Sequence, residues 1–322
     1  MVVLHTFPVK GTQKYLFGTE LQMFGRKFLG RLAAVMLPVT FGTRFIAMRH
    51  LLFPLLFILC ISSCVFQKPP QSMYTNQTYG SYTRNKLDVY LPSVHDTNTA
   101  VVILIHGGGW VAGNKTDWTS EQINSITQNG YAVAAINYRY ADGDFHHQMQ
   151  DVQTAIDYIN SKASLWQIGK NKFALMGASA GGHLSLLYGH GFDSSHVVKA
   201  VISLCGPTDM GDSVFQQYAN NYAIGYVFQQ FLGATEQANP QVFRDASPVN
   251  YHSNVPTLLI HGSLDNLVPP AQSQVMFDTL HFYGIATDTT FLGNAGHDVS
   301  AGGVNNQQIY SEVKNWLQLY LH

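Results

Sequence analysis

Residues 173–183 of this 322-residue chain, Phe-Ala-Leu-Met-Gly-Ala-Ser-Ala-Gly-Gly-His, decide its fold. An apolar run that is typical of a buried strand leads into a Gly-x-Ser-x-Gly pattern, and a helical pattern follows directly. A strand that turns sharply into a helix holds its central residue, Ser179, in a strained and exposed position. The dipole of the following helix favours negative charge beside that serine. The stretch therefore makes Ser179 a candidate nucleophile.

The rest of the chain repeats this alternation of strand and helix. Apolar runs that predict strands occur at residues 87–91, 101–105, 132–136, 173–176, 201–204, 257–260 and 287–292. The first of them alternates in polarity, which favours an edge strand, whereas 101–105 is continuously apolar, which favours a strand buried on both faces. Apolar residues recur at helical spacing over 152–159 and 309–320. The sequence thus predicts an α/β fold whose parallel sheet is covered by helices on both faces.

Composition and charge exclude several classes of protein. Hydrophobic residues make up 46% and charged residues 11%, so the chain is no disordered segment and can bury a sizeable core. The net charge of -1 excludes a nucleic-acid-binding protein that acts through bulk charge. Residues 1–63 hold seven basic side chains and one acid, which leaves 11 basic and 18 acidic residues, a charge of -7, for the remainder. The basic character therefore belongs to the N-terminus.

The N-terminal region has the parts of an export signal. Within residues 48–63, a basic start precedes an apolar run that is too short to span a bilayer, and small residues follow. The end of this segment resembles a bacterial lipobox, which implies cleavage before Cys64 and lipid attachment to it. An uncleaved anchor helix is the alternative. We therefore expect a spurious or disordered extension at 1–47, a lipoprotein signal peptide at 48–63, a tether at 64–73 and the globular domain at 74–322. 

A glycine-rich loop follows the strand predicted at 101–105. Its sequence, His-Gly-Gly-Gly-Trp at residues 106–110, lets successive backbone N–H groups face a cavity without side chains in the way, as an oxyanion hole requires. A Walker loop needs a following Gly-Lys-[Ser/Thr], and the Rossmann pattern of spaced glycines also fails to match. The loop therefore favours stabilisation of a negative oxygen over nucleotide binding.

A serine nucleophile needs a base and a group that orients the base. Asp265 and His297 each follow a predicted strand, so both lie with Ser179 at the carboxyl ends of strands, where open α/β sheets place their sites. The chain order Ser, Asp, His is the order expected on this kind of sheet. Asp209 also follows a strand and is the alternative acid.

With these motifs in place, the sequence resembles the α/β-hydrolases, and within them the esterase and lipase group related to hormone-sensitive lipase. The strings His-Gly-Gly-Gly-Trp and Gly-x-Ser-Ala-Gly-Gly-His also resemble those of bacterial acetylxylan and feruloyl esterases and of kynurenine formamidases. The resemblance covers residues 74–322. It implies a mostly parallel central sheet flanked by helices, with a short lid-like insertion. We place that insertion at 207–254, where packing of ordinary surface helices is the alternative to a lid.

The resemblance also implies a role for each residue of the site. Ser179 matches the nucleophile, His297 the general base and acid, and Asp265 the orienting acid. The backbone N–H of Ala180 matches one oxyanion donor. The N–H groups of Gly108 and Gly109 match the others.

Other polar residues point to structure more than to chemistry. Cys205 closes an apolar run and is predicted to be a buried thiol, which leaves the mature domain without a disulfide. The neighbouring His146 and His147 cannot easily share one ion, so they are predicted to be a solvated pair at a helix start. No sequence motif for a metal is present, and we expect neither a metal nor a cofactor.

These observations predict a serine carboxylesterase that hydrolyses small acyl or aryl esters through an acyl-enzyme. Acetylated or feruloylated carbohydrate is a candidate substrate. The same machinery serves an amidase of the arylformamidase or peptidase type, and a non-catalytic binding module on this scaffold is the hypothesis from another class. The expected partners are a small-molecule ester and a membrane, reached through lipid on Cys64, with no nucleic acid. The expected location is that of an exported lipoprotein at the outer membrane or its periplasmic face.

Overall fold

A computed structural model of the chain describes residues 72–221 and 225–322. The predictions for the extension at 1–47, the signal peptide at 48–63 and the lipidation of Cys64 lie outside the described residues. Among the helices that are described, none combines the length and the apolar character needed to cross a membrane.

In the described residues, eight strands form one sheet. Their order across the sheet is β1 (Met73–Thr78), β2 (Lys86–Tyr90), β4 (Ala132–Ile136), β3 (Val101–Ile105), β5 (Phe173–Ala178), β6 (Val198–Leu204), β7 (Thr257–Gly262) and β8 (Thr287–Leu292). The pairs β1–β2 and β2–β4 are antiparallel, and all other neighbours are parallel. The predicted mostly parallel sheet is confirmed.

The prediction that residues 87–91 form an edge strand is wrong. The strand β2 is paired on both sides, because the polar strand β1 adds to its outer edge. Its polar residue Asp88 is buried and does not face solvent. The carboxylate of Asp88 accepts a hydrogen bond from Lys115 Nζ at 2.6 Å, which compensates the buried charge. A buried residue of an ion pair therefore gives the strand the same alternation of polar and apolar residues as a face exposed to solvent would.

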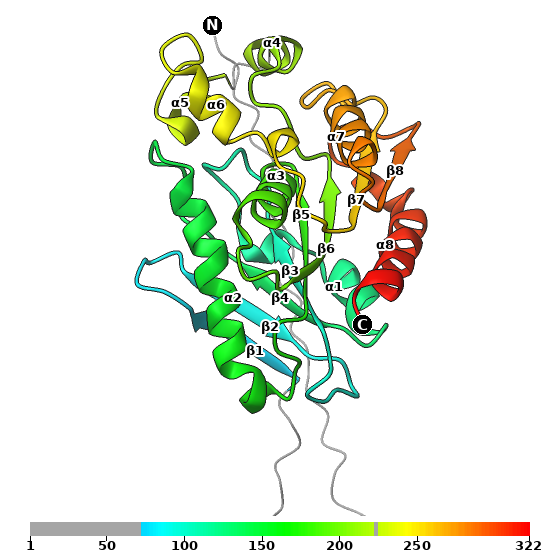
Figure 1. Cartoon of the computed structure of the whole chain (residues 1–322). Coiled ribbons are helices and arrows are strands. Elements are labelled where there is room, and N and C mark those ends of the chain that lie inside the picture. Colours follow the sequence, from blue (N-terminus) through cyan, green and yellow to red (C-terminus); the bar gives the residue numbers. More distant parts are fainter. Residues whose placement is uncertain (1–71, 222–224) are drawn as a thin grey trace, which may run out of the picture. The chain divides into compact units, whose positions relative to one another are not determined.

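Helices cover both faces of the sheet (Figure 1). One core contains side chains of α2 (His146–Trp166), α3 (Ala180–Leu187) and α7 (Ala271–Phe282). The other contains side chains of α1 (Ser120–Thr127) and α8 (Asn306–Tyr320). The apolar stripes predicted for two helices are buried in α2 and α8, which confirms both. Short 3₁₀ turns lie at Lys115–Asp117, Pro248–Asn250 and Ala301–Gly303, and a π turn at Tyr188–Phe192.

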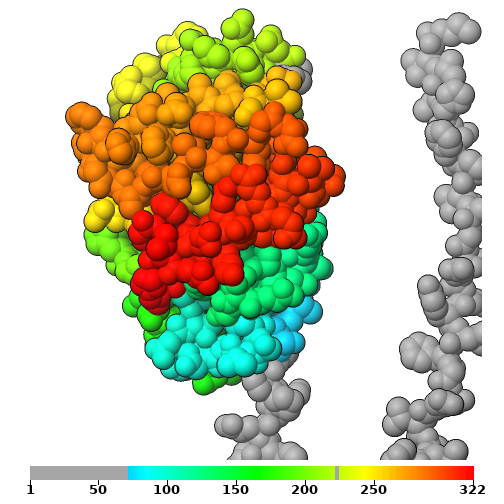
Figure 2. Space-filling view, turned by 90° about the vertical axis from the view of Figure 1, so that its right-hand side faces the viewer, coloured from blue at the N-terminus to red at the C-terminus, as the bar shows by residue number. Residues whose placement is uncertain are grey.

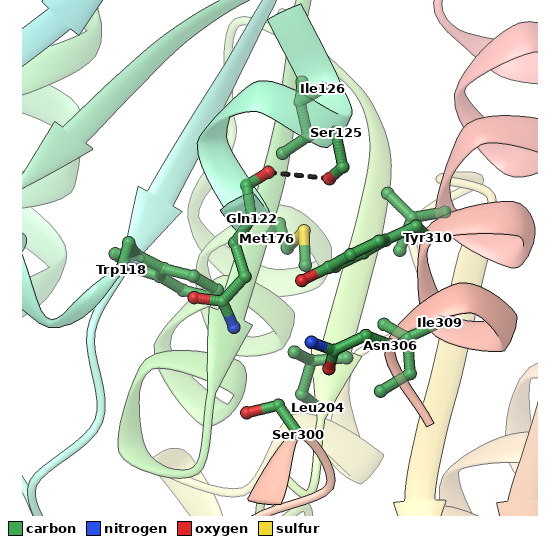
Figure 3. A pocket seen from close by; sticks show the side chains of 11 residues that line it. Trp118, Gln122, Ser125, Ile126, Met176, Leu204, Ser300, Asn306, Ile309 and Tyr310 are labelled. Carbon is green, nitrogen blue, oxygen red and sulfur yellow. Dashed lines mark hydrogen bonds between the residues drawn. The ribbon is translucent and has the colours of Figure 1, made fainter. Parts of the chain in front are cut away.

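The α1 and α8 face is closely packed. Figure 2 shows α8, in red, beside the orange segment that contains α7. A small cavity of about 10 Å³ lies between α1 and α8, and Figure 3 shows that Trp118, Met176 and Tyr310 face it. That volume matches about one water molecule, so the cavity is too small for an organic ligand. None of the predicted catalytic residues lines it.

Between β6 and β7 the described residues form three α-helices inside the range predicted as an insertion. They are α4 (Ser213–Asn221), α5 (Tyr226–Leu232) and α6 (Pro240–Asp245), and Figure 1 shows them gathered at one end of the sheet. Their buried aromatic side chains, among them Phe215, Phe228 and Phe231, join the same core as α2 and α3. This segment is therefore packed on the domain, and its role as a lid stays a prediction.

Candidate active site

Ser179 sits in the sharp turn between β5 and α3. Its φ of 53° and ψ of -120° lie outside the regions that L-residues favour, as predicted for this turn. The backbone holds the strain in place, because Ser179 N–H donates to Leu204 O at 2.7 Å. Position 181 must be glycine, since a Cβ there would lie 2.0 Å from Ile105 O. The close approach of α3 to β3 thus exposes the serine at the carboxyl end of the sheet.

The three predicted catalytic side chains lie in one hydrogen-bonded row. His297 Nε2 is 2.8 Å from Ser179 Oγ, and His297 Nδ1 is 2.7 Å from Asp265 Oδ2. Ser179 follows β5, Asp265 follows β7 and His297 follows β8, so the carboxyl ends of three parallel strands in one half of the sheet supply the row. Because a carboxylate only accepts, Nδ1 of His297 donates to it and Nε2 is left to accept the serine proton.

Asp265 is enclosed and fully hydrogen-bonded. Its side chain has no solvent exposure, and its Oδ1 accepts from Leu267 N–H at 2.8 Å and Val268 N–H at 2.9 Å. Burial by itself would raise the pKa of this carboxyl, but hydrogen bonds from His261 and His297 outweigh it and hold the pKa well below its usual range. Asp265 is therefore an anion beside His297 at any pH near neutrality.

Sequence analysis missed His261, which contacts the same carboxylate. This buried side chain on β7 places Nε2 3.2 Å from Asp265 Oδ2 and 3.0 Å from Val268 O, while Nδ1 lies 2.7 Å from Ser273 Oγ. Both partners of Nε2 are acceptors, so Nε2 carries the proton and donates to the same carboxylate oxygen that His297 contacts. A histidine four residues before Asp265, in an otherwise apolar strand, was the available signal.

The alternative acid, Asp209, makes no contact with the base. Its Oδ1 accepts from Gly211 N–H at 2.9 Å, which closes a local turn. Burial, together with the nearby Asp212 and Glu236, raises its pKa. The structure thus brings Asp265 to His297 and leaves Asp209 in the insertion.

The three predicted oxyanion donors face the same space as the serine. Gly108, Gly109 and Ala180 line one cavity together with Ser179 and His297. Within the described ranges, the N–H groups of Gly108 and Gly109 donate to no protein acceptor. Ala180 opens α3, where the first backbone N–H groups have no partner within the helix. Three donors are therefore available beside Ser179.

The cavity in front of the serine is roomy and apolar. Its volume is about 370 Å³, and its walls are Trp110, Val111, Pro207, Phe215, Tyr226, Val227, Phe228, Leu267 and Val268, besides the residues named above. Helices α4 and α5 supply four of these side chains, so the insertion builds one wall. Among the described lining residues, His297 has the only side chain that can carry a charge near neutral pH. Such a cavity suits an uncharged, apolar group.

Trp110 joins the glycine-rich loop to the insertion. Its indole Nε1 donates to His183 Nδ1 at 3.3 Å, and its ring stacks on Phe231 at 4.5 Å between centroids. His183 in turn donates from Nε2 to Ala246 O at 2.8 Å. Burial lowers the pKa of His183 to about 4, so it is neutral and can both accept and donate. Trp110 and His183 therefore pack and hydrogen-bond between the glycine-rich loop and the insertion.

The described residues contain one group of side chains that could hold a metal ion. Ligand atoms of Cys205, Asp265 and His297 all lie within 4.8 Å of one another. Asp265 and His297 already bond to each other, and burial raises the pKa of the Cys205 thiol, which disfavours the thiolate that a metal requires. Cys205 is the buried thiol that was predicted. His146 and His147 are exposed and pair with Asp144 and Asp142, as expected of a solvated pair.

The mostly parallel sheet, its flanking helices and the strained turn at Ser179 define the α/β-hydrolase fold. A model of the BD-FAE family matches residues 87–280, and the chain belongs to that family. The match ends before His297 and begins after the β1–β2 turn.

Two curated relatives carry names of esterases. Esterase LipC of Mycobacterium tuberculosis is 30% identical over 222 residues, which are 63% of this chain and 53% of LipC. The isoprenylcysteine alpha-carbonyl methylesterase ICME of Arabidopsis thaliana is 26% identical over 236 residues, 68% of this chain and 55% of the relative. The chain thus matches about half the length of these curated relatives.

The fold also occurs in solved structures. A truncated carbohydrate esterase from gut microbiota superposes with a TM-score of 0.67 at 24% identity, over 79% of this chain and 97% of the other. At this identity the likeness establishes the shared fold.

Proposed function

We propose that this protein is a serine carboxylesterase that hydrolyses esters with a small, uncharged acyl or aryl group. The observation that carries the proposal is the row Ser179–His297–Asp265, which opens into an apolar cavity beside free backbone N–H groups. A hydroxyl bonded to a neutral imidazole, itself bonded to a carboxylate, is the arrangement that activates serine for acyl transfer. The names of the relatives, esterase and methylesterase, favour esters over amides as substrates.

The proposed reaction has two halves. In the first, Ser179 Oγ attacks the ester carbonyl while its proton moves to His297 Nε2, and the N–H groups of Gly108, Gly109 and Ala180 stabilise the oxyanion. His297 then gives that proton to the departing alcohol, which leaves an acyl-enzyme. In the second half, His297 takes a proton from water and the resulting hydroxide attacks the acyl carbon. The bond to Ser179 Oγ then breaks, His297 returns the proton to Oγ, and the acid is released. No cofactor takes part in these steps.

The substrate class follows from the walls of the cavity. Aromatic and aliphatic side chains favour an apolar acyl or alcohol group through buried area, and no described charged side chain is placed to recognise an ionised substrate. Hydrolysis of p-nitrophenyl acetate, butyrate and octanoate, followed by acetylated and feruloylated xylan, measures the preference. Release of aryl formamide products at a rate above that of the esters would favour the amidase instead.

The Ser179→Ala variant tests the nucleophile. We expect it to fold, because the substitution removes one half-buried hydroxyl at the cavity wall, and to lose activity on p-nitrophenyl butyrate by about 10³-fold or more. A fluorophosphonate probe should label the natural protein and not the variant. Retention of more than about a tenth of the activity would show that another group attacks the ester. A natural protein that neither hydrolyses esters nor takes the probe would favour the binding module.

We also propose that the protein is exported and anchored through lipid on Cys64. Support comes from the basic start, short apolar run and terminal cysteine of residues 48–64. In a bacterial host, radiolabelled palmitate should enter the natural protein and not Cys64→Ser, and mass spectrometry should find the mature chain beginning at Cys64. A mature chain that keeps residues 48–63 would favour the uncleaved anchor.

A further inference from the structure

A half-buried arginine outside the row of catalytic residues reaches the glycine-rich loop. Arg84 lies in the turn between β1 and β2, and its Nε donates to Tyr138 O at 2.8 Å. Its Nη2 donates to Gly113 O at 3.0 Å and lies 3.2 Å from His106 Nε2. The guanidinium also stacks over the Tyr140 ring, with 3.7 Å between Cζ and the ring centroid. These contacts connect the N-terminal strands to both ends of the loop.

Contacts with Arg84 and with Gly107 together determine which nitrogen of His106 carries the proton. A guanidinium has donors only, so Nε2 of His106 must accept, and the proton of the neutral ring sits on Nδ1. That nitrogen lies 2.7 Å from Gly107 O, which can only accept, so Nδ1–H donates to it. Burial lowers the pKa of His106 to about 4, and the nearby Arg84 charge acts in the same direction. His106 is therefore neutral near pH 7.

The hydrogen bond to Gly107 fixes an oxyanion donor. The carbonyl of Gly107 and the N–H of Gly108 belong to one planar peptide group, and the described chain contains no cis peptide bond. In a trans peptide the two groups point in opposite directions, so holding the carbonyl toward His106 directs the N–H away from it. Gly108 lines the cavity with Ser179, and its φ of 107° keeps this peptide turned. The position of the proton on His106 thereby determines the direction in which the Gly108 N–H points.

We propose that Arg84 is a positioning residue for the oxyanion hole, which acts by holding His106 in the Nδ1-protonated form and so orients the Gly108 N–H. The inference rests on the proposed esterase activity and deepens it. Arg84 touches neither Ser179 nor the cavity. The proposal therefore predicts that replacing Arg84 lowers kcat, although Arg84 makes no contact with the cavity that would hold the substrate.

The experiment compares Arg84→Met, Arg84→Lys and Arg84→Ala with the control Lys86→Met. Lys86 lies on the same hairpin, and among residues 72–221 and 225–322 its side chain bonds only to Thr78, so its variant reports any loss that comes from the hairpin itself. With p-nitrophenyl butyrate we expect kcat of Arg84→Met to fall about tenfold or more, with KM within about threefold, because an oxyanion hole stabilises the transition state. Lys86→Met should keep full activity, and circular dichroism should show all four variants folded.

Two further measurements separate positioning from general structural support. Nitrogen-15 histidine spectra should show an Nδ1-protonated ring in the natural protein, assigned by its absence in His106→Gln, and the Nε2-protonated form in Arg84→Met. Added ethylguanidinium should restore part of the kcat of Arg84→Ala, whereas ethylammonium should not. If Arg84→Met unfolds, Arg84→Lys, which keeps the charge but not the fork of donors, provides the same comparison.

The proposal is overturned by unchanged kcat in the folded Arg84 variants, by an equal loss in Lys86→Met, or by the same His106 protonation with and without Arg84. These outcomes differ from failure of the proposed function, in which the natural protein would show no ester hydrolysis and no labelling by a fluorophosphonate. An active natural protein with an indifferent Arg84 would leave the esterase standing and remove the positioning role.

Discussion

At the scale of single residues, the two candidate acids can be separated by a matched pair of variants. Asp265→Asn should reduce kcat/KM by about 10³-fold or more, because an amide cannot hold His297 as a carboxylate does. Asp209→Asn should stay within about threefold, since that side chain only closes a turn with Gly211. Steady-state hydrolysis of p-nitrophenyl acetate by both variants measures the difference. A severe loss in Asp209→Asn with an active Asp265→Asn would reverse the assignment.

The site residues that could be predicted are those whose position in the fold is indicated by the residues next to them in the sequence. Ser179, Asp265 and His297 each follow a strand that is visible as an apolar run, and parallel strands bring their carboxyl ends together. His261 and Arg84 could not be placed in this way. The partners of Arg84 come from distant segments of the chain, and the contact of His261 with Asp265, four residues on, depends on how the turn after β7 folds back.

At the scale of elements, helix α5 should tune the size of substrate that the cavity accepts. Tyr226 lines the cavity and is 57% exposed, so Tyr226→Ala removes apolar contact without disturbing the core. We expect kcat/KM for p-nitrophenyl octanoate to fall by about 3- to 10-fold, which corresponds to tens of Å² of lost contact, while the acetate is unaffected. Tyr283→Ala is the matched control, because Tyr283 is 52% exposed and lies outside the cavity. Equal losses on both esters would mean that Tyr226 does not contact the substrate.

Most elements were predictable, because parallel strands are buried on both faces and read as continuous apolar runs. The exception, β1, has the polar sequence Met-Tyr-Thr-Asn-Gln-Thr, and its strand conformation comes from pairing with β2. Such a strand leaves no periodic signal, so β2 was assigned to the edge. The helices of the insertion left an aromatic pattern, but the cavity wall that they form depends on how they pack on α3 and the glycine-rich loop.

At the scale of the whole domain, three buried histidines make stability depend on pH. Burial lowers the pKa of His106, His183 and His190 to about 4, against an ordinary value near 6.5. Between these values the unfolded chain binds protons that the folded chain does not, so the free energy of unfolding falls as the pH falls. For each histidine, the free energy of unfolding falls by up to about 1.4 kcal/mol per pH unit, and this fall is complete below pH 4. Urea unfolding at pH 7.0, 6.0 and 5.0 measures this slope.

A single substitution tests the source of that slope. His190 lies away from the cavity, where it contacts Ser253 O and Thr257 Oγ1. His190→Gln should make the slope shallower by about one third, because one of three titrating groups is removed. His281→Gln, which alters an exposed histidine, is the matched control. Parallel slopes for the natural protein and His190→Gln would place the pH dependence elsewhere.

The position of the insertion has a consequence for protein engineering. The segment lies between β6 and β7, and its two ends are already held together by hydrogen bonds: Met210 N–H donates to Ser247 Oγ at 2.8 Å, and Val249 N–H donates to Thr208 O at 3.1 Å. A cassette from another family member, of different length, can therefore be grafted at this place without rewiring the strands. Ala246 marks the limit of such a graft, because its carbonyl accepts the hydrogen bond through which His183 and Trp110 brace the glycine-rich loop. Splice points inside residues 211–245 would exchange the cavity wall and spare that brace.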